Sequence, residues 1–99
     1  MPYTVDEIKE KLEPIFNERG VVRAVLFGSY AKGEATDESD VDIIAHVDNE
    51  MDILDFAEIS GLIENRLNKK IDFIYGGDTL SIQMDAEIKK TGVIIFDKG

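Results

Sequence analysis

The sequence predicts a single α/β domain over residues 1–99, with a mixed four-stranded sheet flanked by helices. Four short apolar runs have strand character: 21–27, 41–47, 71–75 and 93–96. Three stretches with apolar residues at helical spacing lie before or between them: about 4–19, 52–67 and 80–90. The strand–helix–strand order from 41 to 75 favours a right-handed parallel crossover. Together these observations predict a small doubly covered sheet.

Composition and charge exclude some classes of site and ligand for this protein. The chain has no cysteine, which excludes disulfides and thiolate metal sites and fits a reducing cytoplasm. No apolar run approaches the ~20 residues of a membrane span, and the N-terminus lacks the form of a signal peptide. The net charge is −10, from 21 acidic and 11 basic residues. Long nucleic acid is therefore not an expected ligand, whereas a basic protein partner or simple solubility would explain the charge.

The first helix has a recognisable start. Thr4 and Glu7 have the spacing of a capping box, and apolar residues follow at helical spacing. Pro14 lies inside this pattern and is expected to kink or restart the helix. Gly20 then marks its end. Its expected role is to cover one side of the sheet.

The central part contains two strands joined by a polar connection. The run Val21–Phe27 is almost entirely apolar, which is typical of a strand covered on both faces. One helical turn is expected at Ser29–Lys32, closed by Gly33, and residues 34–39 are polar and predict a surface loop. Val41–Val47 is the second strand.

The second half repeats the alternation of helix and strand. Asp52 is the expected N-cap of a helix that ends near Leu67. Ile71–Tyr75 is the third strand and Val93–Phe96 a short strand at a sheet edge. A last helix between them is indicated by Leu80, Met84 and Ile88.

Three aspartates lie at strand starts. Asp40 and Asp42 are two residues apart, so on a strand they share a face, and Asp72 starts the next strand of the parallel crossover. Neighbouring strands are about 4.8 Å apart, so the three carboxylates should converge. Such hard oxygen ligands select Mg²⁺ or Mn²⁺, and two ions about 3.5–4 Å apart would suit in-line displacement. The alternative is that these are ordinary solvated strand ends.

A phosphate-binding turn is predicted beside them. Gly28 lets a backbone approach a phosphate closely, Ser29 adds a hydroxyl, and Lys32 a positive charge. A nucleoside triphosphate spanning Ser29 and the carboxylates is the natural ligand. Alternatively, Ser29 merely caps its short helix and Lys32 is a solvated lysine.

Gly28-Ser29 followed by Asp40-Val41-Asp42 resembles the signature of the DNA-polymerase-β-like nucleotidyltransferase superfamily. The wider runs 26–43 and 87–96 resemble its smallest branch, the minimal nucleotidyltransferases. This resemblance implies that Asp40 and Asp42 bind both metal ions and that Asp72 binds one and helps to deprotonate the attacking hydroxyl. Gly28 and Ser29 would hold the triphosphate, and Lys32 stands where relatives often carry arginine.

The resemblance also implies a partner. Many proteins of this branch are antitoxins paired with a HEPN-type ribonuclease toxin, and the chain would transfer AMP from Mg-ATP to a tyrosine hydroxyl of that toxin. Larger relatives carry an extra acceptor-binding domain, so a partner is expected to supply the acceptor here. Two alternatives stay open: an antitoxin that neutralises its partner by binding alone, and a nucleotidyltransferase that acts on a small-molecule hydroxyl.

Overall fold

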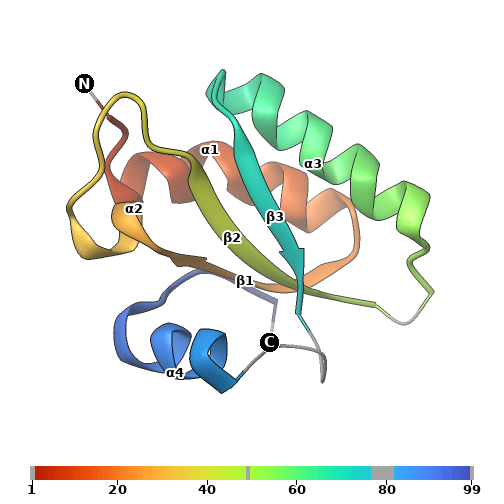
Figure 1. Cartoon of the computed structure of the whole chain (residues 1–99). Helices are drawn as coiled ribbons and strands as arrows, with labels where there is room; N and C mark the ends of the chain where they lie inside the picture. The colour runs from red at the N-terminus through yellow and green to blue at the C-terminus, as the bar shows by residue number, and fades with distance from the viewer. Residues whose placement is uncertain (1, 49, 77–81, 99) are drawn as a thin grey trace.

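The computed structural model describes residues 2–48, 50–76 and 82–98 and confirms the predicted α/β fold (Figure 1). The elements in chain order are α1 (Val5–Glu18), β1 (Val21–Phe27), α2 (Ser29–Lys32), β2 (Val41–Val47), α3 (Ile53–Leu67), β3 (Ile71–Tyr75), α4 (Ile82–Thr91) and β4 (Val93–Asp97). Each matches a predicted element to within a few residues. Leu80, on which the last helix was partly predicted, lies outside the described residues.

The four strands form one mixed sheet in the order β3-β2-β1-β4. β1 is antiparallel to both β2 and β4, whereas β2 and β3 are parallel and are connected through α3. This confirms the parallel arrangement predicted for the crossover and the edge position of the last strand. It also brings the end of β1 and the starts of β2 and β3 to one end of the sheet.

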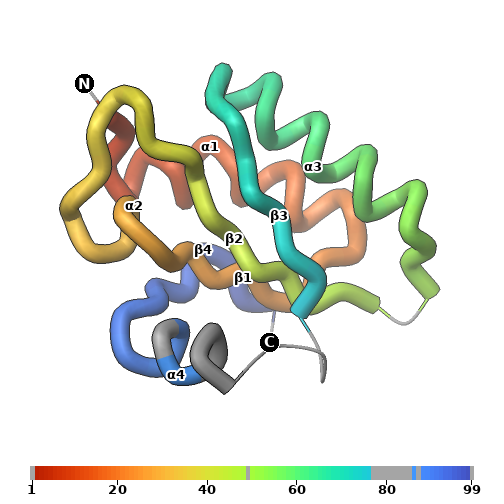
Figure 2. The backbone as a smooth tube through the Cα atoms, in the orientation of Figure 1, coloured from red at the N-terminus to blue at the C-terminus, as the bar shows by residue number. Residues whose placement is uncertain are grey.

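Helices cover both faces of the sheet (Figure 2). α1 and α3 pack together on one face, and α4 packs on the other, against β1. The main core lies under α1 and α3 and includes these fully buried side chains: Ile8, Leu12, Phe16, Leu26, Ile43, Ile59, Ile63 and Ile95. Burying each such side chain stabilises the fold by about 1.5–3 kcal/mol relative to exposure. In β2, the side chains of Val41, Ile43 and Ala45 point into this core and so determine which face of the strand is buried there.

The start of α1 is the predicted capping box. The Glu7 backbone N–H donates to Thr4 Oγ1 at 3.1 Å, and the Thr4 backbone N–H donates to Glu7 Oε1 at 2.9 Å. α1 continues through Pro14 to Glu18, so the helix does not restart there, while the predicted kink stays a prediction. Pro14 lies on the exposed face of the helix, where water can solvate the carbonyl that loses its hydrogen-bond donor.

The capping box makes α1 sensitive to pH. The hydrogen bonds from Thr4 lower the pKa of Glu7 below its usual 4.5. A carboxyl whose pKa is lower in the folded state stabilises the fold above its unfolded pKa and loses that contribution as the pH falls through the folded pKa. We expect Glu7→Ala to lower the melting temperature at pH 7 and to have less effect below about pH 4. Thermal melts across this range, with Glu10→Ala as the control outside the box, measure the difference; a pH-independent difference would contradict the prediction.

No helix in the described parts of the chain is both long and apolar enough to cross a membrane.

Candidate active site

The end of β1 approaches the start of β2 unusually closely at Gly28. Gly28 has φ +73° and ψ −150°, a region of backbone conformation that is essentially restricted to glycine. A Cβ built at this position would collide with Asp42 Oδ2 and lie 3.3 Å from Asp42 Cγ. The pairing of Phe27 with Asp42 in the antiparallel β1–β2 ladder explains this contact. The carboxylate of Asp42 therefore lies directly against the glycine backbone, as the sequence predicted for these two motifs.

Asp72 lies beside Asp42 on the neighbouring strand. The two residues are paired in the parallel β2–β3 register, so their side chains leave the same face of the sheet, about 4.8 Å apart at the backbone. Ile43 and Phe73, the next pair, face the core under α3. Asp42 and Asp72 therefore lie on the opposite face, the one on which α4 packs. Asp42 is half-buried and Asp72 is exposed.

Asp40 is the third predicted carboxylate. It is exposed and immediately precedes β2, whose first residue Val41 donates its N–H to the Lys70 carbonyl at 3.1 Å. This bond fixes the start of β2 next to the start of β3. Within the described ranges, no three acidic or histidine side chains are arranged so as to hold a metal ion. The structure therefore brings Asp42 and Asp72 together, while the convergence of all three carboxylates stays a prediction.

The predicted phosphate-binding turn is the single helical turn α2. The Gly28 carbonyl accepts from the Lys32 N–H at 3.1 Å, and Gly33 closes the turn in the left-handed conformation. The first N–H groups of such a turn have no hydrogen-bond acceptor within the turn itself. Gly28 has no side chain that could cap them. They are thus available to an anion beside the half-buried Ser29, and the Lys32 side chain is exposed nearby.

Lys69 holds the loop before Asp40 in position, a role that was not predicted from the sequence. Lys69 Nζ donates to the Asp37 carbonyl at 2.7 Å and lies 5.9 Å from the ring centroid of Tyr30. Tyr30 is buried, so Lys69 links α2, the loop before Asp40 and the turn before β3. In the sequence, the run Asn68-Lys69-Lys70 indicates only that the helix before it ends in positive charge.

The donor chemistry at this end of the sheet fits Mg²⁺. Carboxylate oxygens are the ligands that Mg²⁺ prefers, typically one or two of them with substrate phosphate and water. Asp42 and Asp72 provide such oxygens on adjacent strands. The glycine backbone against Asp42 leaves no side chain between this carboxylate and the turn that follows. The residues present therefore suit a divalent cation that bridges to a phosphate chain.

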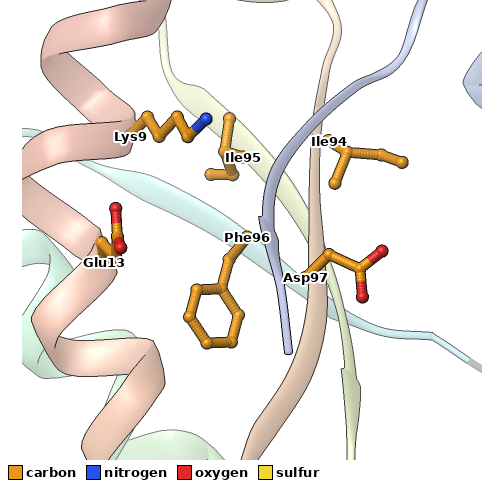
Figure 3. A pocket seen from close by; sticks show the side chains of 6 residues that line it. All are labelled: Lys9, Glu13, Ile94, Ile95, Phe96 and Asp97. Atoms are coloured by element: carbon orange, nitrogen blue, oxygen red, sulfur yellow. The ribbon is translucent and has the colours of Figure 1, made fainter. Parts of the chain in front are cut away.

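A hollow of the fold lies away from the three aspartates. It has a volume of about 330 Å³, lies between α1 and β4, and is lined by Lys9, Glu13, Ile94, Ile95, Phe96 and Asp97 (Figure 3). Figure 3 shows Lys9 and Glu13 coming from the helix toward Ile95 and Phe96 of the strand. At the candidate site, Asp40 and Asp72 are exposed and Asp42 is half-buried.

Comparison with protein families matches residues 10–99 to the family described as "Polymerase beta, Nucleotidyltransferase". The chain belongs to this nucleotidyltransferase family. A "putative protein adenylyltransferase" of Methanocaldococcus jannaschii is 37% identical over 70 residues, which cover 71% of this chain and 75% of the relative. The protein adenylyltransferase MntA of Thermococcus cleftensis is 35% identical over 75 residues, covering 72% and 76% of the two chains.

Chains from two solved structures have a similar fold. A chain from a crystal structure of a toxin–antitoxin with AMP-PNP superposes with a TM-score of 0.76 at 18% identity, covering 91% of this chain and 73% of that one. A chain from the tri-AMPylated Shewanella oneidensis HEPN toxin in complex with MNT antitoxin gives a TM-score of 0.71 at 15% identity, covering 96% and 74%. At these identities the likeness concerns the fold.

Proposed function

We propose that this nucleotidyltransferase transfers AMP from ATP to a tyrosine hydroxyl of a HEPN-type ribonuclease toxin and so acts as its antitoxin. The observation that carries the proposal is the placement of Asp42 beside Asp72 and against the Gly28 backbone, in a chain of this family. The names of the relatives support the reaction type: they are protein adenylyltransferases. The reaction belongs in the cytoplasm, where ATP is abundant and where a chain without cysteine needs no oxidising environment.

The turn after β1 holds the triphosphate of ATP. The N–H groups at the start of α2 and the Ser29 hydroxyl donate to phosphate oxygens. Lys32 contributes a positive charge from the end of the same turn. Gly28 is required because any side chain at that point would occupy the space of the Asp42 carboxylate.

Asp40, Asp42 and Asp72 are the residues that would hold Mg²⁺. When bound, the metal ions would neutralise the charge that develops on the phosphates during an in-line displacement. Asp40 and Asp42 would contact both ions, and Asp72 one of them. Asp42 lies two residues after Asp40 and pairs with Asp72 on β3, so it is adjacent to both of the other carboxylates in this arrangement.

Asp72 is the residue that accepts the proton. The tyrosine oxygen of the acceptor forms a bond to the α-phosphorus, the bond from that phosphorus to the β-phosphate oxygen breaks, and pyrophosphate leaves with the electron pair. The proton of the tyrosine hydroxyl goes to Asp72, which is exposed on the edge strand β3 and accessible to an incoming side chain. The products are AMP-tyrosine and pyrophosphate.

A protein acceptor suits the surface of this chain. The net charge of −10 would steer a basic protein toward it, and Asp40 and Asp72 are exposed to solvent. The solved complexes of related folds include a HEPN toxin that carries AMP groups and is bound to an MNT antitoxin.

Transfer of label from α-³²P-ATP to a HEPN-type protein, taken from the neighbouring gene where that gene encodes one, tests this function. With Mg²⁺, the wild-type chain is expected to label that protein and to abolish its ribonuclease activity. With EDTA, labelling should stop and ATP affinity in calorimetry should fall, because the carboxylates then repel the triphosphate. Neutralisation without labelling would instead support an antitoxin that acts by binding alone, and label on a small metabolite would support a small-molecule acceptor. Metal-independent ATP affinity would contradict the assigned metal site.

A further inference from the structure

An exposed apolar surface lies at the start of α3, outside the proposed active site. Ile53 and Leu54 are 82% and 76% exposed, and Tyr75 at the end of β3 is 50% exposed. Ile53 and Tyr75 also line a hollow of about 330 Å³ together with Val47, Met51, Asp52 and Phe56. We call the six apolar residues Val47, Met51, Ile53, Leu54, Phe56 and Tyr75 the α3 patch. Contiguous exposed apolar surface of this kind marks an interaction site.

The α3 patch has a firm aromatic floor. The Phe56 ring stacks on Phe73 with centroids 4.4 Å apart, and Tyr75 packs edge-on against Phe56 at 5.8 Å. The core contacts of α3 come from Ile59, Ile63 and Leu67 further along the helix. Ile53 and Leu54 are therefore not needed to anchor α3 to the sheet, and they project from a surface that is already ordered by ring packing.

Acidic side chains surround the α3 patch. Asp48, Glu50, Asp52 and Asp55 are all exposed in the turn before α3 and in its first turn. The nearby Arg19 pairs with Glu58 at 2.8 Å, so its charge is already balanced. An occupant that places apolar side chains in the hollow would therefore gain from lysine or arginine at its flanks.

The α3 patch and the active site both include residues of the edge strand β3. Asp72 and Tyr75 are three residues apart, about 10 Å along this strand. They lie on opposite faces of the sheet, Tyr75 on the α3 face and Asp72 on the α4 face, so an occupant must pass around the β3 edge to reach both. We infer that the α3 patch docks an apolar segment of the protein substrate, flanked by basic residues, and that docking there presents the acceptor hydroxyl to Asp72. This inference rests on the proposed function, because it names the surface that recognises the acceptor protein.

The double variant Ile53→Ser/Leu54→Ser tests the docking surface. Both residues are exposed and serine is favourable near a helix start, so the fold should persist. The affinity for the same HEPN-type protein, measured by calorimetry, should fall at least about tenfold, as expected for a central apolar contact. Added salt should weaken wild-type binding. ATP binding should not change. Ile94→Ser is the matched control, since Ile94 is 51% exposed beside the hollow at β4 and is expected to bind the partner normally.

Four outcomes would overturn the docking surface: unchanged affinity of the double variant, an equal loss in Ile94→Ser, no wild-type binding to the HEPN protein, or a loss only of self-association. The result for catalysis is separate. If the wild-type chain binds the HEPN protein through the α3 patch but transfers no AMP to it, the proposed reaction is wrong and the docking surface stands. If AMP is transferred while the double variant binds with full affinity, the reaction stands and the docking surface is wrong.

Discussion

Asp42→Asn is expected to abolish AMP transfer while the protein remains folded. The Asp42 carboxylate lies against the Gly28 backbone, and Asp42 is paired with Asp72 in the β2–β3 register. Replacing it with a neutral amide removes a proposed metal ligand, and electrostatic stabilisation of the transition state is usually the largest single contribution to catalysis. We expect a loss of at least about 100-fold in the labelling rate. The denaturation midpoint should stay the same or rise, because one of two neighbouring negative charges has been removed.

The matched control for this prediction is Asp6→Asn. It makes the same change of charge at an exposed position in the first turn of α1, a helix that carries none of the predicted site residues. Labelling of the partner by the control should equal that of the wild type. Full transfer activity in Asp42→Asn, measured under identical conditions, would show that the site has been placed wrongly.

Gly28→Ala is expected to remove both activity and stability. At φ +73° and ψ −150°, an alanine is strained by about 1–3 kcal/mol. Its Cβ would also collide with the Asp42 carboxylate, so the side chain or the strand end must move. We expect a lower midpoint in urea denaturation and a labelling rate close to that of Asp42→Asn.

Gly33→Ala separates the backbone strain from the collision. Gly33 also has φ +73°, but a Cβ there meets no atom within 4 Å among the described residues. Its left-handed conformation costs about 1–2 kcal/mol for alanine, so stability should fall in a similar way. Labelling by Gly33→Ala should nevertheless be retained at a temperature where it is folded. Equal loss of labelling in both variants would mean that the contact between Gly28 and Asp42 has no special role.

Local signals were sufficient to predict most of this fold. Two helix caps could be predicted from residues three apart in the sequence. One is the capping box at Thr4 and Glu7, and the other is the N-cap Asp52, which accepts the Asp55 N–H at 2.9 Å. The apolar runs of β1 and β2 have the predicted bounds, because a strand buried on both faces leaves a continuous apolar signal. The connection predicted that Asp72 lies at the same end of the sheet as Asp42, since parallel strands joined by a helix start at the same end. Their direct pairing is given by the register in the structure.

Features that depend on tertiary contacts were not visible in the sequence. The helix passes through Pro14 because that residue happens to face solvent. Tyr30 is buried and covered by Lys69 from a distant turn, and nothing near either residue predicts their contact. The exposure of Ile53 and Leu54 also depends on where α3 is placed over the sheet, which periodicity does not determine.

The hydrogen bond from the Val41 N–H to the Lys70 carbonyl anchors the start of β3 against the start of β2. A slip of β3 by one residue along β2 would turn Asp72 toward the hydrophobic interior and expose Phe73. This single backbone bond, just before β3, therefore helps to determine which side chain of β3 faces the proposed site.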